Sequence, residues 1–463
     1  MPTADDRGTG EASGAGPRAE LLKFPHPYQA ALTVASDIDN ASYRRFAAIH
    51  ALLGGREAIR PGTDEWQTLG LSESSAWYDV AAGGVPALGL DFADSFFLIA
   101  DAVTLGMYRD QPGGGFREDE SDGHNAADAI RAWLQRGQVD SFHAFHHYTR
   151  GQVLPLLEGF YAWCEREGAA KPSVWLNHSL GVTPTGLAPL ALRPNRLARL
   201  ARQIARATIG PLLGRERRPL GQALVWYEGA RPGSRYYVND ILAANGLRYV
   251  WMNSGDALAN RIALPERTYG DRPSILDIAT MDDGVRYYHF ARCYGKPDAR
   301  PTAGLCLRQS EGTTDTSSLF TQENLDRLCR EQGTCILFTH WTLKRSFPIS
   351  DETIGHFDLV RRYRDAGRIW VAPLGRLLEW TRVRTFLQYE VREEAGRLVI
   401  DLAGVDDPIF GRAPLRLEDC RGLAFRMSRA AGEVAIAVAG QPLAPELYSR
   451  QDNVCWIHSG PRG

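Results

Sequence analysis

Three apolar segments of this chain each end in a side chain that is common in enzyme active sites. The run of residues 30–36 precedes Asp37, a second segment ends in His143, and a third precedes His340. A continuous apolar run suits a strand that is covered on both faces, as in a parallel sheet or barrel. Enzymes with such sheets assemble their active sites at the carboxyl ends of the strands. The pattern therefore predicts an α/β fold with a site at this edge.

The histidine pair has the spacing of metal ligands. His143 and His147 are four residues apart at an expected strand-to-helix junction. On a first helical turn, residues i and i+4 lie on one face, so two neutral imidazoles can bind one divalent ion. The structural alternative is a pair of polar residues near the end of an element.

The acid pair offers a third ligand. Asp37 and Asp39 are two residues apart at a strand end and so project from the same face. Two carboxylates this close are costly unless a cation or hydrogen bonds compensate their charge. An N-cap and turn is the alternative, because Asp and Asn favour both roles.

In chain order, these segments resemble the NodB-homology polysaccharide deacetylases of the carbohydrate esterase class. The order is an acid pair, a histidine pair, the segment Arg231-Pro232-Gly233 and the late His340, over roughly residues 32–380. The resemblance implies an irregular (β/α)7-type barrel. It also implies metal-dependent removal of an acetyl group from an N-acetyl sugar, within a glycan or a glycan precursor.

Site roles follow from the same resemblance. The implied metal is a divalent ion, with Zn²⁺ as first choice, and the implied substrate is an acetylated carbohydrate. The implied residues are Asp37 as base, Asp39, His143 and His147 as metal ligands, His340 as general acid, and Arg231 as the cation that keeps the base ionised.

The chain departs from the family pattern at several points. Ile38 separates the two acids, so their roles as base and ligand can be exchanged, and Ala144 stands where the family has Ser or Thr. The Arg-Pro-Gly segment is contracted, which makes Arg235 a rival to Arg231. An insertion at about residues 41–139 separates the acid pair from the histidine pair.

Other functions remain open at this point. The same groups suit hydrolysis of another non-peptide C–N or ester bond, and the altered motifs also fit a catalytically inactive glycan-binding or scaffold protein. A glycosidase is the weaker alternative, since Asp37 and Asp39 on one strand do not flank a bond from opposite sides.

Further side chains at expected strand ends are candidates to line the substrate site. Aromatic rings there can stack on sugars, although packing in the core is their commoner role. A histidine there is equally suited to a site or to a structural role. These candidates are His178, Tyr227, Trp251 and Trp341.

Strand-like and helix-like stretches alternate over most of the chain, and hairpin-like runs follow. Residues 1–22 are expected to be a disordered lead-in, residues 23–383 a deacetylase-like barrel, and residues 384–463 a small β-rich domain. Further expected strands are 174–178, 223–227, 247–252 and 369–372, and expected helices are 197–209, 237–245 and 324–332.

Composition limits the partners and the compartment. The net charge of −2 recommends neither nucleic acid nor an anionic membrane, and no apolar stretch approaches the ~20 residues of a membrane helix. The N-terminus has no signal-peptide pattern, and the seven cysteines contain no CxxC. Reduced thiols and a cytoplasmic enzyme are therefore expected.

Overall fold

The chain forms two compact units in the computed structural model. The large unit is Tyr28–Thr381, and the small unit combines Met1–Pro27 with Arg382–Gly463. The structure describes residues 19–38, 40–54, 60, 62–71, 87–100, 105–143, 148–176, 229–251, 275–293, 319–342, 347–428 and 432–458.

The large unit is built on an eleven-stranded sheet whose main path runs β11-β12-β10-β9-β8-β3-β2-β13. Neighbours along this path are parallel, except that β11 is antiparallel to β12. Strand β14 pairs with β2, and β4 and β5 extend from β3. The strands are β2 (Ala30–Ser36), β3 (Asp94–Ala100), β4 (Gly106–Asp110), β5 (Phe116–Glu118), β8 (Val139–His143), β9 (Val174–Leu176), β10 (Tyr249–Trp251), β11 (Asp277–Thr280), β12 (Arg286–His289), β13 (Thr334–Thr339) and β14 (Ile369–Val371).

One further contact links distant strands of the path. Cys293, four residues beyond the end of β12, forms an isolated parallel bridge with Leu337 of β13. The Cys293 amide donates to Ile336 O, and the Phe338 amide donates to Cys293 O. A closed barrel requires such a connection, and the barrel itself remains a prediction.

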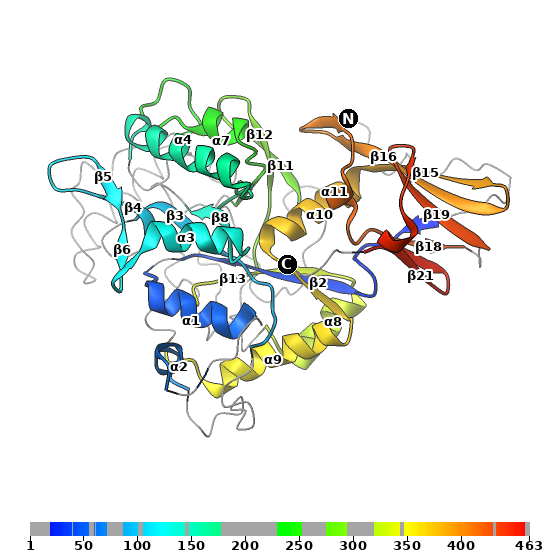
Figure 1. The fold of residues 1–463 in the computed structure, drawn as a ribbon, viewed down its shortest axis with the longest axis horizontal. Coiled ribbons are helices and arrows are strands. Elements are labelled where there is room, and N and C mark those ends of the chain that lie inside the picture. Colours follow the sequence, from blue (N-terminus) through cyan, green and yellow to red (C-terminus); the bar gives the residue numbers. More distant parts are fainter. Residues whose placement is uncertain are drawn as a thin grey trace, which may run out of the picture. The chain divides into compact units, whose positions relative to one another are not determined.

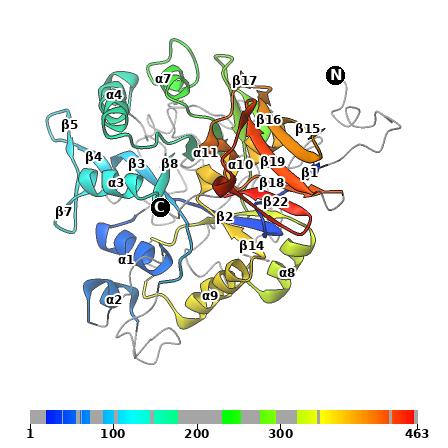
Figure 2. The same cartoon turned by 45° about the vertical axis from the view of Figure 1, so that its right-hand side comes forward.

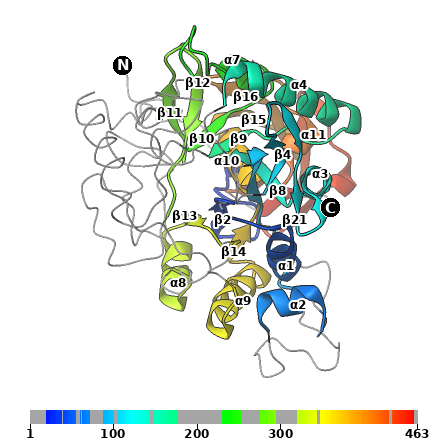
Figure 3. The same cartoon turned by 90° about the vertical axis from the view of Figure 1, so that its left-hand side faces the viewer.

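Helices cover the outer face of this sheet, with α4 and α7 above the strands and α1, α8 and α9 below them in Figures 1 and 3. Figure 2 gives a second view of the same helices. Phe160 of α4 packs against Phe96 and Phe142, with ring centroids 5.7 and 5.3 Å apart. None of the helices in the described ranges is both long and apolar enough to cross a membrane. The helices are α1 (Tyr43–Gly54), α2 (Asp64–Leu69), α3 (Ala126–Gln135), α4 (Arg150–Glu167), α7 (Asn239–Ala244), α8 (Gln322–Arg330), α9 (Asp351–Asp365) and α10 (Leu374–Phe386).

Polar caps explain where several of these helices begin. The side chains of Asn125, Thr321 and Ser350 each accept a hydrogen bond from a backbone amide in the first turn of α3, α8 and α9. Such caps satisfy amides that have no partner within the helix.

Most expected elements that fall on described residues are confirmed. Strands occur at the predicted places as β2, β9, β10, β13 and β14, and α7 and α8 lie within or beside the expected helices. The region 41–139, predicted as an insertion, supplies β3 between β2 and β8. The expected strand 223–227 and helix 197–209 lie outside the described residues.

The small unit is rich in β-structure, and its boundary at Arg382 lies two residues from the expected one. Residues 19–21, expected within the disordered lead-in, form β1, which pairs with β18. The hairpin of β15 and β16 turns at Ala395 and Gly396, both of which have positive φ. The other strands of this unit pair through β16 or β18 and their neighbours. Its strands are β1 (Ala19–Leu21), β15 (Leu387–Glu394), β16 (Arg397–Asp407), β17 (Gly411–Ala413), β18 (Ala424–Met427), β19 (Glu433–Val438), β20 (Gln441–Pro442), β21 (Tyr448–Gln451) and β22 (Val454–Ile457).

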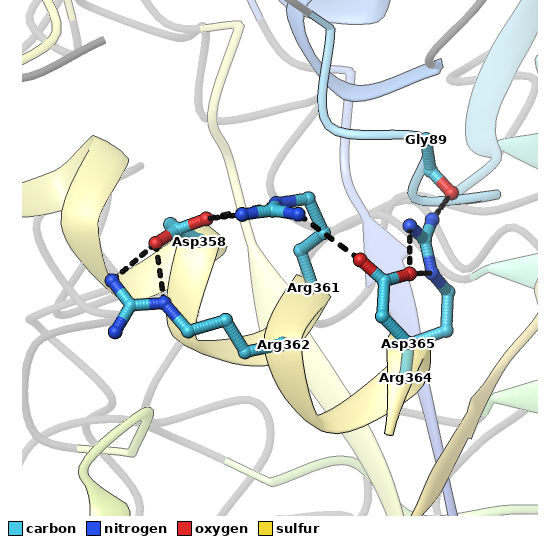
Figure 4. A network of polar contacts seen from close by, with 6 residues as sticks. All are labelled: Gly89, Asp358, Arg361, Arg362, Arg364 and Asp365. Carbon is cyan, nitrogen blue, oxygen red and sulfur yellow. Dashed lines mark hydrogen bonds and ion pairs between the residues drawn. The ribbon is translucent and has the colours of Figure 1, made fainter. Parts of the chain in front are cut away.

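A polar network fixes the C-terminal half of α9 (Figure 4). The buried Asp358 carboxylate accepts hydrogen bonds from Arg361 and Arg362. Arg364 donates to the carbonyl of Gly89. The φ of Gly89 is +64°, in the left-handed region, so the backbone favours glycine there.

Asp140 joins β8 to the start of α10 and has an unusual protonation equilibrium. Ser141 Oγ donates to Asp140 Oδ1 at 2.6 Å, and the Gly375 amide donates to Oδ2 at 2.7 Å. Burial raises the pKa of Asp140 to about 6, against the opposing effect of these two hydrogen bonds. The folded state therefore binds this proton more tightly than the unfolded chain does.

We expect Asp140→Asn to stabilise the protein at neutral pH. The raised pKa contributes stability that is complete below about pH 4 and is lost as the pH rises through about 6. Asn cannot ionise. Its oxygen can accept from the Gly375 N–H while its NH2 group donates to Ser141 Oγ, which then acts as the acceptor. Urea denaturation should give a variant more stable by on the order of 1–2 kcal/mol at pH 7.5, with the difference vanishing near pH 4. A constant difference across this range would contradict the assignment.

Candidate active site

The sheet has one face that packs on the helices and an opposite face, called here the inner face. Residues of β8 show which side chains point to each face. Phe142 packs on Phe160 of α4, so it faces the helices. Successive residues of a strand point to opposite faces. His143 therefore points away from the helices, and its ring contacts Phe97 edge to face at 4.5 Å.

The same alternation places the other predicted site residues on this inner face. Ile38 belongs to the core cluster that includes Phe46 of α1. Trp341 packs on Phe357 of α9, with ring centroids 6.1 Å apart. Their predecessors in the chain, Asp37 and His340, consequently point to the opposite face, at the carboxyl ends of β2 and β13.

Asp37 lies between two cationic or titratable partners. Arg292 Nη1 donates to Asp37 Oδ1 at 2.8 Å, and His340 Nε2 lies 3.7 Å from Asp37 Oδ2. The Asp37 amide donates to Thr339 O at 2.9 Å, which ties the two strand ends together. Asp37 is 5% exposed and His340 1%. This arrangement pairs a carboxylate that can accept a proton with an imidazole that can donate one.

Arg292 belongs to this cluster but is not among the site residues predicted from the sequence. Its guanidinium carbon lies 3.3 Å from the ring centroid of Trp251 and 3.7 Å from that of Phe338. Arg292 is fully buried, whereas Arg231, expected in this role, lies in an exposed turn. The rival Arg235 is also exposed and donates to Tyr236. The ionic partners of Asp37 among the described residues are thus Arg292 and His340.

The imidazole of His143 has the orientation of a metal ligand. Its Nδ1 lies 3.1 Å from the carbonyl oxygen of Leu176. A carbonyl only accepts, so Nδ1 must carry the proton and a neutral ring has its lone pair on Nε2. Metal-binding histidines commonly have this carbonyl bond on the second nitrogen. The residue present therefore fits a metal ligand.

The rest of the predicted metal site is not in the described part of the chain. Asp39 and His147 lie outside the described residues, and α4 begins only at Arg150. His143 is the last residue of a strand, so the expected helical turn does not include it. Within the described ranges, no three His, Cys, Asp or Glu side chains form a group that could hold a metal.

The predicted substrate-lining residues have different positions. Trp251 is 3% exposed, and Arg292 covers one face of its ring. Trp341 is fully buried on the helix side. Both rings are therefore packed in the core of this structure, which is the commoner role of aromatic side chains. His178 and Tyr227 lie outside the described residues.

Other titratable groups beside the site are held neutral. A hydrogen bond with Cys293 and burial raise the pKa of Cys335 well above its ordinary value. Burial lowers the pKa of His289, at the end of β12, to about 4. A buried protonated thiol at Cys335 and a neutral imidazole at His289 suit packing, because cysteine reacts as the thiolate.

Comparison with known proteins assigns the chain to no family. No protein-family model matches the chain, and no curated protein matches it. The resemblance to the polysaccharide deacetylases therefore stays a prediction.

Proposed function

We propose that this chain is a metal-dependent hydrolase that removes an acetyl group from an N-acetyl sugar, in a glycan or a glycan precursor. The observation that carries the proposal is the buried Asp37 carboxylate, bonded to Arg292 at 2.8 Å and 3.7 Å from His340. Base and acid are adjacent at the carboxyl ends of parallel strands, where α/β enzymes place such groups.

Each residue has a defined task in this proposal. Asp37 removes a proton from the attacking water, and Arg292 holds the carboxylate in its orientation and balances its charge. His340 then gives a proton to the departing amine or alcohol. The ion pair with Arg292 supports Asp37 as the base.

A divalent ion such as Zn²⁺, when bound, supplies Lewis-acid activation of the acetyl carbonyl and of water. His143 would bind it through Nε2, because its Nδ1 hydrogen is directed to Leu176 O. Asp39 and His147 would complete the set of protein ligands in the proposed site. We place the enzyme in the cytoplasm, a proposal that the six free cysteines of the described residues support.

Metal content tests this proposal without requiring turnover. We expect near-stoichiometric zinc or another divalent ion in the wild type, measured by elemental mass spectrometry on protein purified without metal-affinity resin. His143→Ala should reduce the metal content at least about tenfold, since a first ligand is lost. His289→Ala removes a buried histidine from the end of β12, which β10 and β9 separate from β8, and should leave the metal content unchanged.

Acetate release from a panel of N- and O-acetylated sugars is the accompanying assay. Metal-loaded wild type should release acetate, and chelation should abolish the release. A wild type that holds no metal after reloading would overturn the proposed hydrolase and leave the glycan-binding alternative.

A further inference from the structure

We infer that Asp94 is a positioning residue that sets the geometry of His340 and Asp37 from the opposite face of the sheet. The inference rests on the proposed function. Asp94 begins β3 and points toward the helices, where it contacts Trp341 and His50. It acts through the main chain on which both side chains are mounted.

The first link runs from Asp94 to the residue after His340. Asp94 Oδ2 accepts a hydrogen bond from Trp341 Nε1 at 2.8 Å and lies 2.9 Å from His50 Nε2. Asp94 and Trp341 are both fully buried, and His50 of α1 is 2% exposed. Water cannot compete at this depth, so the two donors fix the carboxylate and the carboxylate fixes the indole.

A second set of bonds holds the neighbouring main chain. Ser95 Oγ donates to Ser36 O at 2.8 Å, directly before Asp37. Arg45 Nε donates to Thr342 O at 2.9 Å, two residues beyond His340. The start of β3 and helix α1 therefore fix both strand ends that carry the base and the acid.

The packing of Trp341 alone does not explain why a carboxylate is buried at Asp94. Trp341 already lies between Phe92 and Phe357, with ring centroids 5.6 and 6.1 Å away. Asp94 Oδ1 is buried and has no hydrogen-bond partner among the described residues. An unpaired buried carboxylate oxygen costs stability. What the carboxylate adds is a directional bond that fixes the rotation of the indole and, with it, the chain at His340.

Asp94→Ala and Asp94→Asn separate this role from general stability. We expect kcat to fall about 100-fold in Asp94→Ala with KM within about twofold, because base and acid lose their alignment while binding groups stay. Asp94→Asn should recover at least about tenfold of this loss, since the amide oxygen can still accept from the Trp341 N–H. Asp358→Asn, the same change at the buried carboxylate of α9, should leave kcat unchanged.

A second pair of variants tests the same inference if Asp94→Ala does not fold. Trp341→Phe keeps the aromatic packing and removes the N–H donor, so it should also lower kcat. Trp380→Phe is its control, because this buried indole N–H has no hydrogen-bond partner among the described residues. Unchanged kcat in Trp341→Phe would overturn the inference, because this variant removes the N–H that bonds to Asp94.

An independent readout distinguishes this inference from the proposed hydrolase activity. In protein with 13C-labelled histidines, the His340 ring signal is assigned by its loss in His340→Gln. We expect this signal to shift in the Asp94 variants and to stay in place in Asp358→Asn. If the wild type releases no acetate, the proposed function fails while the ring signal still tests Asp94. An unmoved signal in a folded Asp94→Ala protein would overturn the positioning role.

Discussion

Asp37→Asn is expected to lower acetate release at least about 10³-fold, because an amide cannot accept the proton of the attacking water. The change is nearly isosteric, and the Asn oxygen can still accept from Arg292 Nη1, 2.8 Å away in the wild type. The loss should therefore appear in kcat, with KM little changed. Initial rates on the best acetylated sugar of the panel measure both.

Two measurements must accompany this variant. Bound metal should remain, since Asp37 is proposed as the base and not as a ligand. Circular dichroism should show a folded protein. Asp358→Asn, which alters a buried carboxylate outside the site, should keep its activity. Turnover near the wild-type rate in folded, metal-loaded Asp37→Asn would remove Asp37 from the role of base and favour Asp39.

The sequence was most informative where chemistry and local structure coincide. The apolar run before Asp37 and the one before His340 are strands β2 and β13, paired in register up to Ser36 and Thr339. Because parallel strands end at the same edge, two such runs predict that Asp37 and His340 share one edge of the sheet. The structure adds that β2 and β13 are neighbours, which brings the two side chains close. The 3.7 Å contact between Asp37 and His340 agrees with that reasoning.

The cationic partner of Asp37 was harder to predict, because the order of the strands in the sheet determines which arginine lies beside it. Arg292 and Asp37 are 255 positions apart, and they meet because the segment after β12 bridges to β13, the neighbour of β2. A local Arg-Pro-Gly motif contains no information on this order, which is why Arg231 was preferred. Arg292 follows the aromatic strand 286–289 near its end, so the same strand-end rule would have made it a candidate.

Alternation along the strand would have corrected one aromatic prediction. If His340 points into the site, Trp341 must point to the helices, where it bonds to Asp94. Its burial is thus a consequence of the assignment of His340. The position of Trp251 beside Arg292 has no such local signal, because it depends on a charge from the segment after β12.

Arg292→Met is expected to destabilise the large unit by about 3–5 kcal/mol, the range for removal of one partner of a buried ion pair. Arg292 is fully buried between Trp251 and Phe338, and its loss leaves the Asp37 charge without its main counter-ion. Met fills much of the same volume and packs well on aromatic rings. Urea denaturation should therefore report mainly the cost of the uncompensated charge. Acetate release should fall as well.

A double-mutant cycle separates charge from packing at this position. In Asp37→Asn/Arg292→Met neither charge remains, so the double variant should be more stable than Arg292→Met alone, with a coupling energy of about 1–3 kcal/mol. Arg292→Lys keeps a charge but loses the planar stacking between the two rings, and it should not restore full activity. Additive effects in the cycle would mean that the aromatic contacts, and not the bond to Asp37, account for the buried arginine.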